Sequence, residues 1–137
     1  MAGELLLDTG PLVSLLDRSQ RRHRDCLACF ESWAGPVVTT EAVLTEATHL
    51  LGRVTGGREA CLDFVLEGGA QLAPPSLASL KRSRDLVARY SALPMDYADA
   101  TLVALGEELD CDLVFTLDRR GFETYRLGRR RPFRIVP

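Results

Sequence analysis

The chain has 137 residues, with 17 basic and 19 acidic side chains and a formal net charge of −2. Hydrophobic residues make up 46% and charged residues 26%, a mixture typical of soluble globular proteins that excludes a disordered chain. This length predicts one domain over residues 1–137, because domains cluster around about 100–150 residues. Lys81 is the only lysine, which excludes a phosphate-binding loop of the G-x-x-x-x-G-K-S/T type, and no G-x-G-x-x-G dinucleotide motif occurs.

Short apolar runs and longer segments with a 3.6-residue period alternate along the first half of the chain. The short runs are typical of strands buried between helices, and the longer segments are typical of helices with one apolar face. In chain order, the predicted elements are a strand over 4–7, a helix beginning at Pro11 with Gly10 as its N-cap, a helix from Ser19 to Trp33, a strand over 36–39, and helices over 41–51, capped by Thr40, and 57–66.

The second half continues the same alternation of strands and helices. The expected elements are a strand over 71–73, a helix capped by Ser76 and reaching Tyr90, a helix over 96–109, a strand over 113–116, a further helix, and a closing strand over 133–136. Strands separated by helices predict the α/β class, with a three-layer sandwich around a short, mostly parallel central sheet.

The N-terminal segment and the cysteines bear on the cellular compartment. The segment lacks a basic region followed by a long apolar run, and no apolar run approaches the roughly 20 residues of a membrane span. We therefore expect a cytoplasmic protein with no membrane partner, in which thiols stay reduced. Cys26 and Cys29 form a C-x-x-C motif near His23, which is consistent with a zinc or redox site or with small buried side chains. We favour buried side chains, because no second pair of ligands completes a metal set.

Two aspartates directly follow predicted strands. Asp8 ends the apolar run 5–7, and Asp118 lies just beyond the run 113–116. In open α/β sheets, ligands bind at the carboxyl ends of the strands. A carboxylate buried there is unfavourable unless it is paired or bound to a cation, although either aspartate alone is also consistent with a turn or a helix cap.

Two predicted helices supply three more carboxylates. Asp96 and Asp99 are three residues apart, so they share one face of the first turn of their helix. Asp96 is the better candidate for the N-cap, which leaves Asp99 to point into a site. Glu46 is flanked by apolar residues in the helix over 41–51, close to the buried face of that helix.

The candidate site therefore consists of Asp8, Glu46, Asp99 and Asp118, with Asp96 as a fifth acid. Carboxylates gathered in a low-dielectric cleft repel one another unless a hard cation neutralises them. A set of oxygen ligands without paired histidine or cysteine favours Mg²⁺ or Mn²⁺ over zinc. Such a metal site suits the hydrolysis of a phosphodiester bond.

The same segments resemble the PIN domain family, and within it the VapC-type toxin ribonucleases of toxin–antitoxin pairs. The resemblance is carried, in this order, by residues 7–12, 44–47, 96–100 and 116–120 with Phe122, and it extends to the closing strand. It implies a PIN-like fold, a Mg²⁺- or Mn²⁺-dependent endoribonuclease activity on RNA, a homodimer, and inhibition by a small cognate antitoxin.

The resemblance also implies roles for individual acids. Asp8 and Asp99 match the principal metal ligands of the family. Glu46 would bind the metal directly or through water, and Asp118 would complete the site, often through water or a second ion. Asp96 matches a position that is acidic in some relatives and not in others.

Hydroxyl and guanidinium groups beside these acids are candidates for support of the site and for substrate binding. Thr9 and Thr116 are expected to support the acids by hydrogen bonds, the role that orients metal ligands. Arg119 and Arg120 directly follow Asp118 and are the preferred RNA contacts, because arginine binds phosphate through two parallel hydrogen bonds. The arginines over 18–24 come second, and solvated helix faces or a charged tail remain the alternative for every arginine cluster, including the one over 126–134.

Two other functions use a strand-end aspartate. A non-catalytic regulatory module, such as a phospho-receiver domain, needs a lysine after a late strand, where this chain has Arg119. A phosphatase-like hydrolase with an aspartate nucleophile usually begins with Asp-x-Asp, and Gly10 stands at the second position here. Both fit the chain less well than a metal-dependent ribonuclease.

Overall fold

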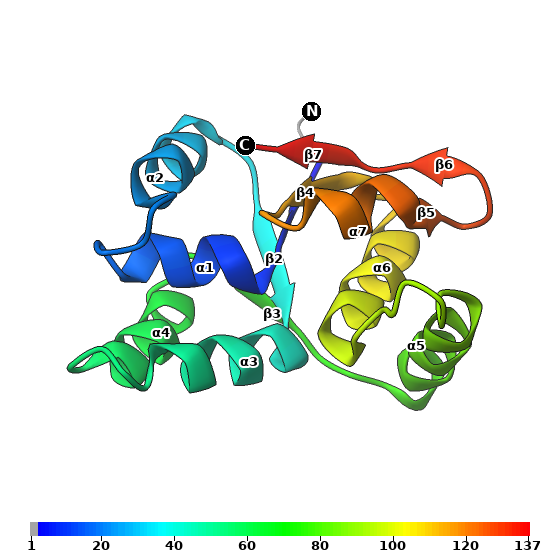
Figure 1. The fold of residues 1–137 in the computed structure, drawn as a ribbon, viewed down its shortest axis with the longest axis horizontal. Helices are drawn as coiled ribbons and strands as arrows, with labels where there is room; N and C mark the ends of the chain where they lie inside the picture. The colour runs from blue at the N-terminus through cyan, green and yellow to red at the C-terminus, as the bar shows by residue number, and fades with distance from the viewer. Residues whose placement is uncertain (1–2) are drawn as a thin grey trace.

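Five short strands form one parallel sheet in the computed structural model, which describes residues 3–137 (Figure 1). The order across the sheet is β3 (Gln71–Ala73), β2 (Val37–Thr40), β1 (Leu5–Leu7), β4 (Leu113–Phe115) and β7 (Arg134–Val136). Leu6 of β1 lies opposite Val38 of β2 and Val114 of β4, so β1 is the central strand. Every pairing in this sheet is parallel, where the sequence predicted a mostly parallel sheet.

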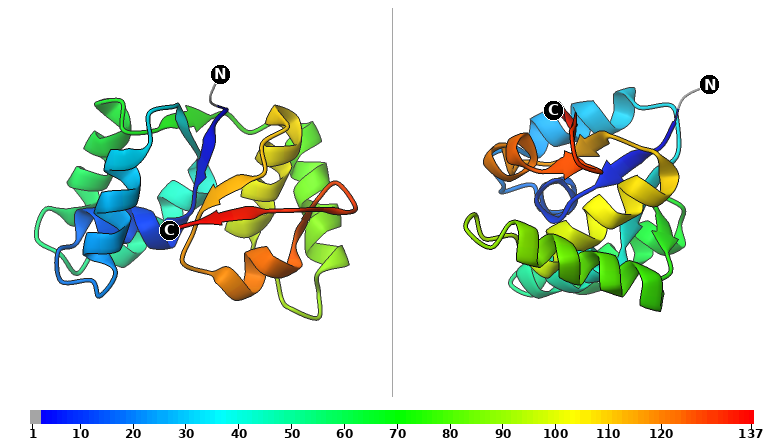
Figure 2. Two further views of the ribbon diagram at one scale, coloured as in Figure 1. Left: turned by 90° about the horizontal axis from the view of Figure 1, so that it is seen from above. Right: turned by 90° about the vertical axis from the view of Figure 1, so that its right-hand side faces the viewer.

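Helices cover both faces of the sheet, and the predicted α/β class and three-layer arrangement are confirmed (Figure 2). The helices are α1 (Thr9–Leu16), α2 (His23–Ser32), α3 (Glu41–Leu51), α4 (Gly57–Leu66), α5 (Leu77–Arg89), α6 (Tyr97–Leu109) and α7 (Arg119–Thr124). Seen from above, α1, α2 and α4 lie on one side of the strands, and α5 and α6 lie on the other. Helix α3 contacts both α1 and α6, so it joins the two sides.

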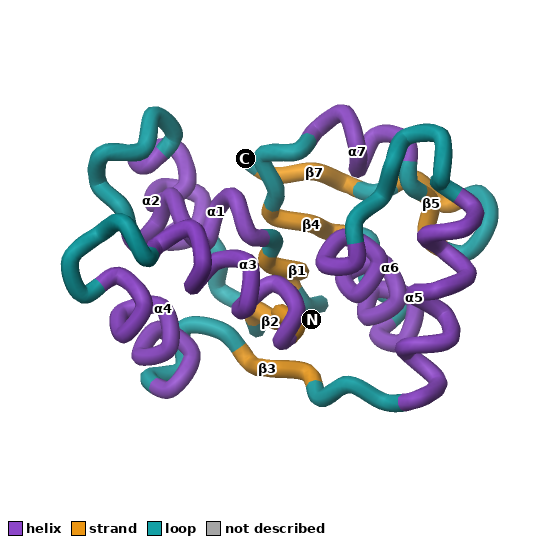
Figure 3. The backbone as a smooth tube through the Cα atoms, turned by 60° about the horizontal axis from the view of Figure 1, so that its bottom comes forward, coloured by secondary structure: helices purple, strands orange, loops and turns teal. Residues whose placement is uncertain are grey.

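Strands β2, β1 and β4 lie side by side (Figure 3), and because they pair in parallel their carboxyl ends lie at one edge of the sheet. Strand β1 consists of three leucines, all buried, because helices pack on both of its faces. Helix α6 packs closely on this strand, since a Cβ added to Gly106 would lie 3.1 Å from Cδ1 of Leu6. The backbone N–H of Asp8 donates to the carbonyl oxygen of Phe115 at 3.0 Å. The residues that follow β1 and β4 are therefore neighbours.

Two predicted helix beginnings are wrong. The N-cap of α1 is Asp8 rather than Gly10, because the Asp8 carboxylate accepts the first backbone N–H of the helix at 2.8 Å. Helix α2 begins at His23 rather than near Ser19. The reason is that Asp17 accepts both the backbone N–H of Ser19, at 3.0 Å, and its hydroxyl, at 2.7 Å. Ser19 therefore donates to a turn instead of capping a helix.

Three other predicted helix caps are confirmed. Thr40 caps α3, Ser76 caps α5 and Asp96 caps α6, each through a side-chain oxygen that accepts a backbone N–H three residues later. The Asp96 cap has a direct consequence for the predicted site, because it assigns the two neighbouring aspartates to different tasks.

The C-terminal arginines form ion pairs with the segment between α6 and β4. Some of them lie on an antiparallel hairpin that the sequence pattern does not predict, which consists of β5 (Arg126–Leu127) and β6 (Arg131–Pro132). Arg131 bonds to Asp110 at 2.6 Å and to Asp112 at 2.9 Å, and Arg134 bonds to Asp112 at 2.8 Å. These two arginines hold the C-terminal segment against the end of α6, which is a structural role.

The C-x-x-C segment lies on α2. Cys26 is fully buried and Cys29 is partly buried. Nδ1 of His23 lies 2.7 Å from the carbonyl oxygen of Ser14, within hydrogen-bond distance. These contacts agree with the interpretation of small buried side chains. Within residues 3–137, no helix is both long enough and apolar enough to cross a membrane.

Candidate metal centre

Asp8 is the most deeply buried of the predicted acids, with 5% of its surface exposed. Its Oδ1 accepts the backbone N–H of Thr9 at 2.8 Å, and its Oδ2 accepts the hydroxyl of Thr116 at 2.7 Å. Burial raises the pKa of Asp8 from its ordinary 3.8 to about 6, because desolvation outweighs these two hydrogen bonds. The nearby carboxylates of Glu46 and Asp118 account for smaller parts of this increase in the pKa.

Thr116 connects Asp8 with Asp118 at the end of β4. Its Oγ1 donates to Asp8 and accepts the backbone N–H of Asp118 at 2.9 Å. The exposed Asp118 side chain in turn caps α7, because its Oδ1 accepts the backbone N–H of Gly121 at 3.0 Å. The buried Thr116 hydroxyl therefore fixes the Asp8 carboxylate and the backbone of Asp118 relative to each other.

Asp96 and Asp99 divide two tasks at the beginning of α6. The Asp96 carboxylate accepts the backbone N–H of Asp99 at 2.9 Å and caps the helix. This leaves the Asp99 carboxylate free of the cap, and its Oδ2 accepts the hydroxyl of Tyr125 at 3.1 Å. Desolvation, followed by the charges of Asp8 and Asp96, raises the pKa of Asp99 to about 8. A negative charge on the Asp99 carboxylate is therefore poorly compensated by its surroundings.

Two adjoining clefts are lined by four of the five predicted acids, and the buried Asp8 lines neither of them. Asp96, Asp99 and Asp118 line one small cleft, which Arg120 and Tyr125 also line. Glu46 lies in the neighbouring cleft, and Asp96 lines that one too, so Asp96 stands between them.

The other substrate-binding candidates, Arg119, Thr9 and Thr116, line neither of these clefts. Arg119 does not line the cleft of Arg120, because its guanidinium contacts the carbonyl oxygen of Pro137 at 3.3 Å and the carboxylate of Glu123 at 3.7 Å. The hydroxyl of Thr9 is buried without a partner in the part of the chain that the structure describes. Thr9 contacts Asp8 through its backbone N–H instead.

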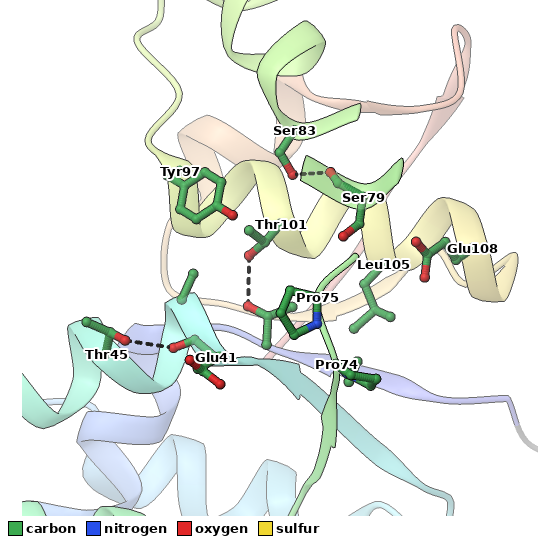
Figure 4. A pocket seen from close by; sticks show the side chains of 13 residues that line it. Glu41, Thr45, Pro74, Pro75, Ser79, Ser83, Tyr97, Thr101, Leu105 and Glu108 are labelled. Carbon is green, nitrogen blue, oxygen red and sulfur yellow. Dashed lines mark hydrogen bonds between the residues drawn. The ribbon is translucent and has the colours of Figure 1, made fainter. Parts of the chain in front are cut away.

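A third cleft lies between the beginning of α3, the segment before α5, and α6 (Figure 4). It is lined mainly by hydroxyl groups, prolines and Tyr97, and none of the five predicted acids lines it. Its hydroxyl pair has a structural consequence for the site. Oγ1 of Thr40 and Oγ1 of Thr101 are 2.7 Å apart, and this bond ties the beginning of α3, the helix of Glu46, to α6, the helix of Asp99.

The donor chemistry of the acidic cleft fits a hard divalent cation. All predicted ligands are carboxylates, and their mutual repulsion is what a bound cation relieves. Among residues 3–137, no three His, Cys, Asp or Glu side chains are already gathered closely enough to enclose a metal ion. Mg²⁺ does not require such a cage, because it usually keeps several waters and binds one or two carboxylates.

Sequence reasoning missed two residues at this cleft. Tyr125 bonds to Asp99, and Gly121 lies so close to Asp118 that an added Cβ would be 2.4 Å from the carboxylate oxygen Oδ2. Tyr125 has no local signal in the sequence, because its partner Asp99 is 26 residues away along the chain.

The chain thus combines an α/β fold with carboxylates near the carboxyl ends of parallel strands, an arrangement typical of α/β proteins that bind a ligand at this edge of the sheet. The PIN domain family model matches residues 5–127, and the chain belongs to this family. No curated protein matches the chain.

Three solved structures show the same fold. VapC20 of Mycobacterium tuberculosis, described as a toxin that cleaves the sarcin-ricin loop, is 19% identical, with a TM-score of 0.79 over 92% of this chain and 99% of its own. A toxin–antitoxin complex from Klebsiella pneumoniae is 19% identical, with a TM-score of 0.69 over 97% and 96% of the two chains. VapBC2 of Rickettsia felis, bound to a promoter DNA fragment, is 11% identical, with a TM-score of 0.69 over 98% and 99%.

Proposed function

We propose that this protein is a metal-dependent endoribonuclease that hydrolyses RNA phosphodiester bonds in the cytoplasm, and that it is the VapC-type toxin of a toxin–antitoxin pair. PIN domain proteins are generally nucleases, and we propose that the predicted acids of this chain serve such a reaction. The observation that carries the proposal is the arrangement of three acids: Asp99 and Asp118 line one cleft, and Thr116 connects Asp118 with the buried Asp8. Membership of the PIN family does not favour the phospho-receiver alternative.

Asp8 and Asp99 would hold a Mg²⁺ or Mn²⁺ ion, with Asp118 and Glu46 completing the site directly or through water and Asp96 contributing at the rim. When bound, the cation would supply Lewis-acid chemistry, which activates a water molecule and neutralises the charge that develops on the phosphodiester. The hydrogen bonds from Thr9 and Thr116 orient the Asp8 carboxylate for this task.

The partners of the protein are part of the same proposal. A homodimer is supported by the exposed leucines Leu50, Leu62 and Leu66 on α3 and α4, since exposed apolar side chains favour association. A cognate antitoxin is supported by the similarity of fold to the toxin–antitoxin complex from Klebsiella pneumoniae and to VapBC2 of Rickettsia felis.

Metal dependence tests the activity. Purified protein is expected to cleave total cellular RNA with Mg²⁺ or Mn²⁺, and to stop when EDTA is in excess, because the uncompensated carboxylates cannot activate water on their own. Gel analysis of the RNA measures cleavage, and addition of Mn²⁺ beyond the EDTA is the control for reversibility. Full cleavage in EDTA would overturn the mechanism.

Arg120 is the stronger of the two arginine candidates for RNA binding, because it lines the cleft with Asp118. Arg120→Ala is expected to raise the Kd for RNA about threefold to tenfold and to lower the salt slope of binding by about one, as for the loss of one phosphate contact. Filter binding at several salt concentrations measures both quantities. Arg58→Ala, at an exposed position on α4, is the matched control. Equal effects of the two substitutions would assign binding to net charge rather than to Arg120.

A further inference from the structure

We infer that Tyr125 is a positioning residue, which holds the Asp99 carboxylate in the orientation that binds the cation. The inference rests on the proposed metal-dependent function and adds a residue that neither the motifs nor the resemblance assigned. It begins from a contact between the end of α7 and the beginning of α6.

The hydroxyl of Tyr125 donates to Oδ2 of Asp99 at 3.1 Å. Tyr125 is 1% exposed, so solvent has little access to the ring that carries this donor. The bond occupies Oδ2, and Oδ1 of Asp99 accepts no hydrogen bond from any residue over 3–137. One carboxylate oxygen is thus held by the protein, and the other is left for a ligand.

The ring of Tyr125 is fixed by two aromatic neighbours. Its centroid lies 5.1 Å from that of Phe122, at an interplanar angle of 80°, and 5.1 Å from that of Tyr90, at 64°. Edge-to-face contacts of this kind favour one ring orientation. The hydroxyl therefore stays directed at Asp99 instead of turning to solvent.

Helix α7 places Tyr125 and Asp118 at the same cleft. Asp118 is the N-cap of this helix and Tyr125 is its C-cap. A Cβ added to Gly121, between them, would lie 2.4 Å from Oδ2 of Asp118 and 3.2 Å from Cε2 of the Tyr125 ring. The absence of a side chain at Gly121 therefore lets the helix lie close to both Asp118 and Tyr125.

The charges around Asp99 explain why a donor is needed. Asp8, Asp96 and Asp118 surround the Asp99 carboxylate with negative charge. Without a donor, repulsion favours orientations of the Asp99 side chain that point away from the other acids. Binding of the cation would then have to turn this side chain back toward the site, at a cost in binding free energy. A fixed hydroxyl removes that cost. Loss of such a hydrogen-bond partner of a metal ligand generally lowers metal affinity or activity by about 10- to 100-fold.

Tyr125→Phe tests the inference, because it keeps the ring and removes only the hydroxyl. The matched control is Tyr90→Phe, which removes a hydroxyl from the same aromatic cluster, where it accepts the backbone N–H of Arg126 at 3.0 Å. Isothermal titration with Mn²⁺, in the absence of RNA, measures the Kd. We expect the Kd to rise about tenfold or more in Tyr125→Phe, and to change little in Tyr90→Phe. In RNA cleavage at limiting Mn²⁺, kcat should fall in Tyr125→Phe while the KM for RNA stays the same.

The outcomes separate the inference from the proposed function. Wild-type protein that binds no Mn²⁺ would overturn both. Wild-type protein that binds Mn²⁺ with the same Kd as Tyr125→Phe would overturn the role of Tyr125 alone. An equal rise in Kd for both phenylalanine variants would also overturn it, because the effect would then belong to the packing of the aromatic cluster.

Discussion

Asp8→Asn is expected to lower RNA cleavage by more than about a hundredfold, since even residues that only orient metal ligands contribute about 10- to 100-fold. Asn keeps an oxygen for the N–H of Thr9, so α1 retains its cap. It removes the negative charge through which Asp8 would hold a cation. The loss should therefore appear in kcat and in Mn²⁺ affinity, measured by RNA cleavage and by titration calorimetry.

The matched control for this substitution is Asp63→Asn, which removes one negative charge from an exposed position on α4, outside the acidic clefts. Its cleavage rate and Mn²⁺ affinity should equal those of the wild-type protein. Circular dichroism establishes that both variants are folded. Cleavage by Asp8→Asn at a rate near that of the wild-type protein would remove Asp8 from the proposed metal ligands.

Asp99→Asn is expected to stabilise the metal-free protein at about pH 8 while abolishing its activity. The pKa of Asp99 is about 8 in the folded chain, against an ordinary 3.8, so between these values the folded state binds more protons than the unfolded state. The free energy of unfolding of the metal-free protein therefore falls as the pH rises through this window. Because Asn is neutral, the Asp99→Asn variant avoids this decrease in the free energy of unfolding, which is on the order of 2 kcal/mol after screening by solvent.

Thermal unfolding in EDTA over about pH 5 to 9 measures this effect. The Tm of the wild-type protein should decline with pH, the Tm of Asp99→Asn should decline less, and the difference near pH 8 should reach about 5 °C. Added Mn²⁺ should reverse the order, because only the wild-type site gains from binding. Asp63→Asn should follow the wild-type curve. Parallel curves for Asp99→Asn and the wild-type protein would mean that the Asp99 carboxylate is not destabilised by its neighbours.

The sequence predicted those structural features of the candidate site that depend on local pattern. Strand-end positions identified Asp8 and Asp118, and the three-residue spacing of Asp96 and Asp99 separated the cap from the free carboxylate. These predictions hold structurally because caps and the edge of a parallel sheet follow from local chemistry.

The parts that failed depend on competition or on distant contacts. Ser19 has the composition of an N-cap, but Asp17 captures both of its donors. The strands β5 and β6 have two residues each, which is too short for the alternation of apolar and polar residues that predicts a strand. Tyr125 looks like a core aromatic residue, and only the position of α7 against α6 brings its hydroxyl to a carboxylate.

The six-residue length of α7 fixes the spacing between Asp118 and Tyr125, and this spacing can be used to recognise proteins with the same cleft. Insertion of one residue into a helix turns everything beyond it by about 100°, which would carry the tyrosine away from Asp99 and leave Asp118 in place. Relatives that keep this arrangement should therefore conserve the spacing of aspartate, glycine and tyrosine from 118 to 125, and tolerate length changes outside it. That spacing can be searched for in genomes where overall identity has fallen too low to align.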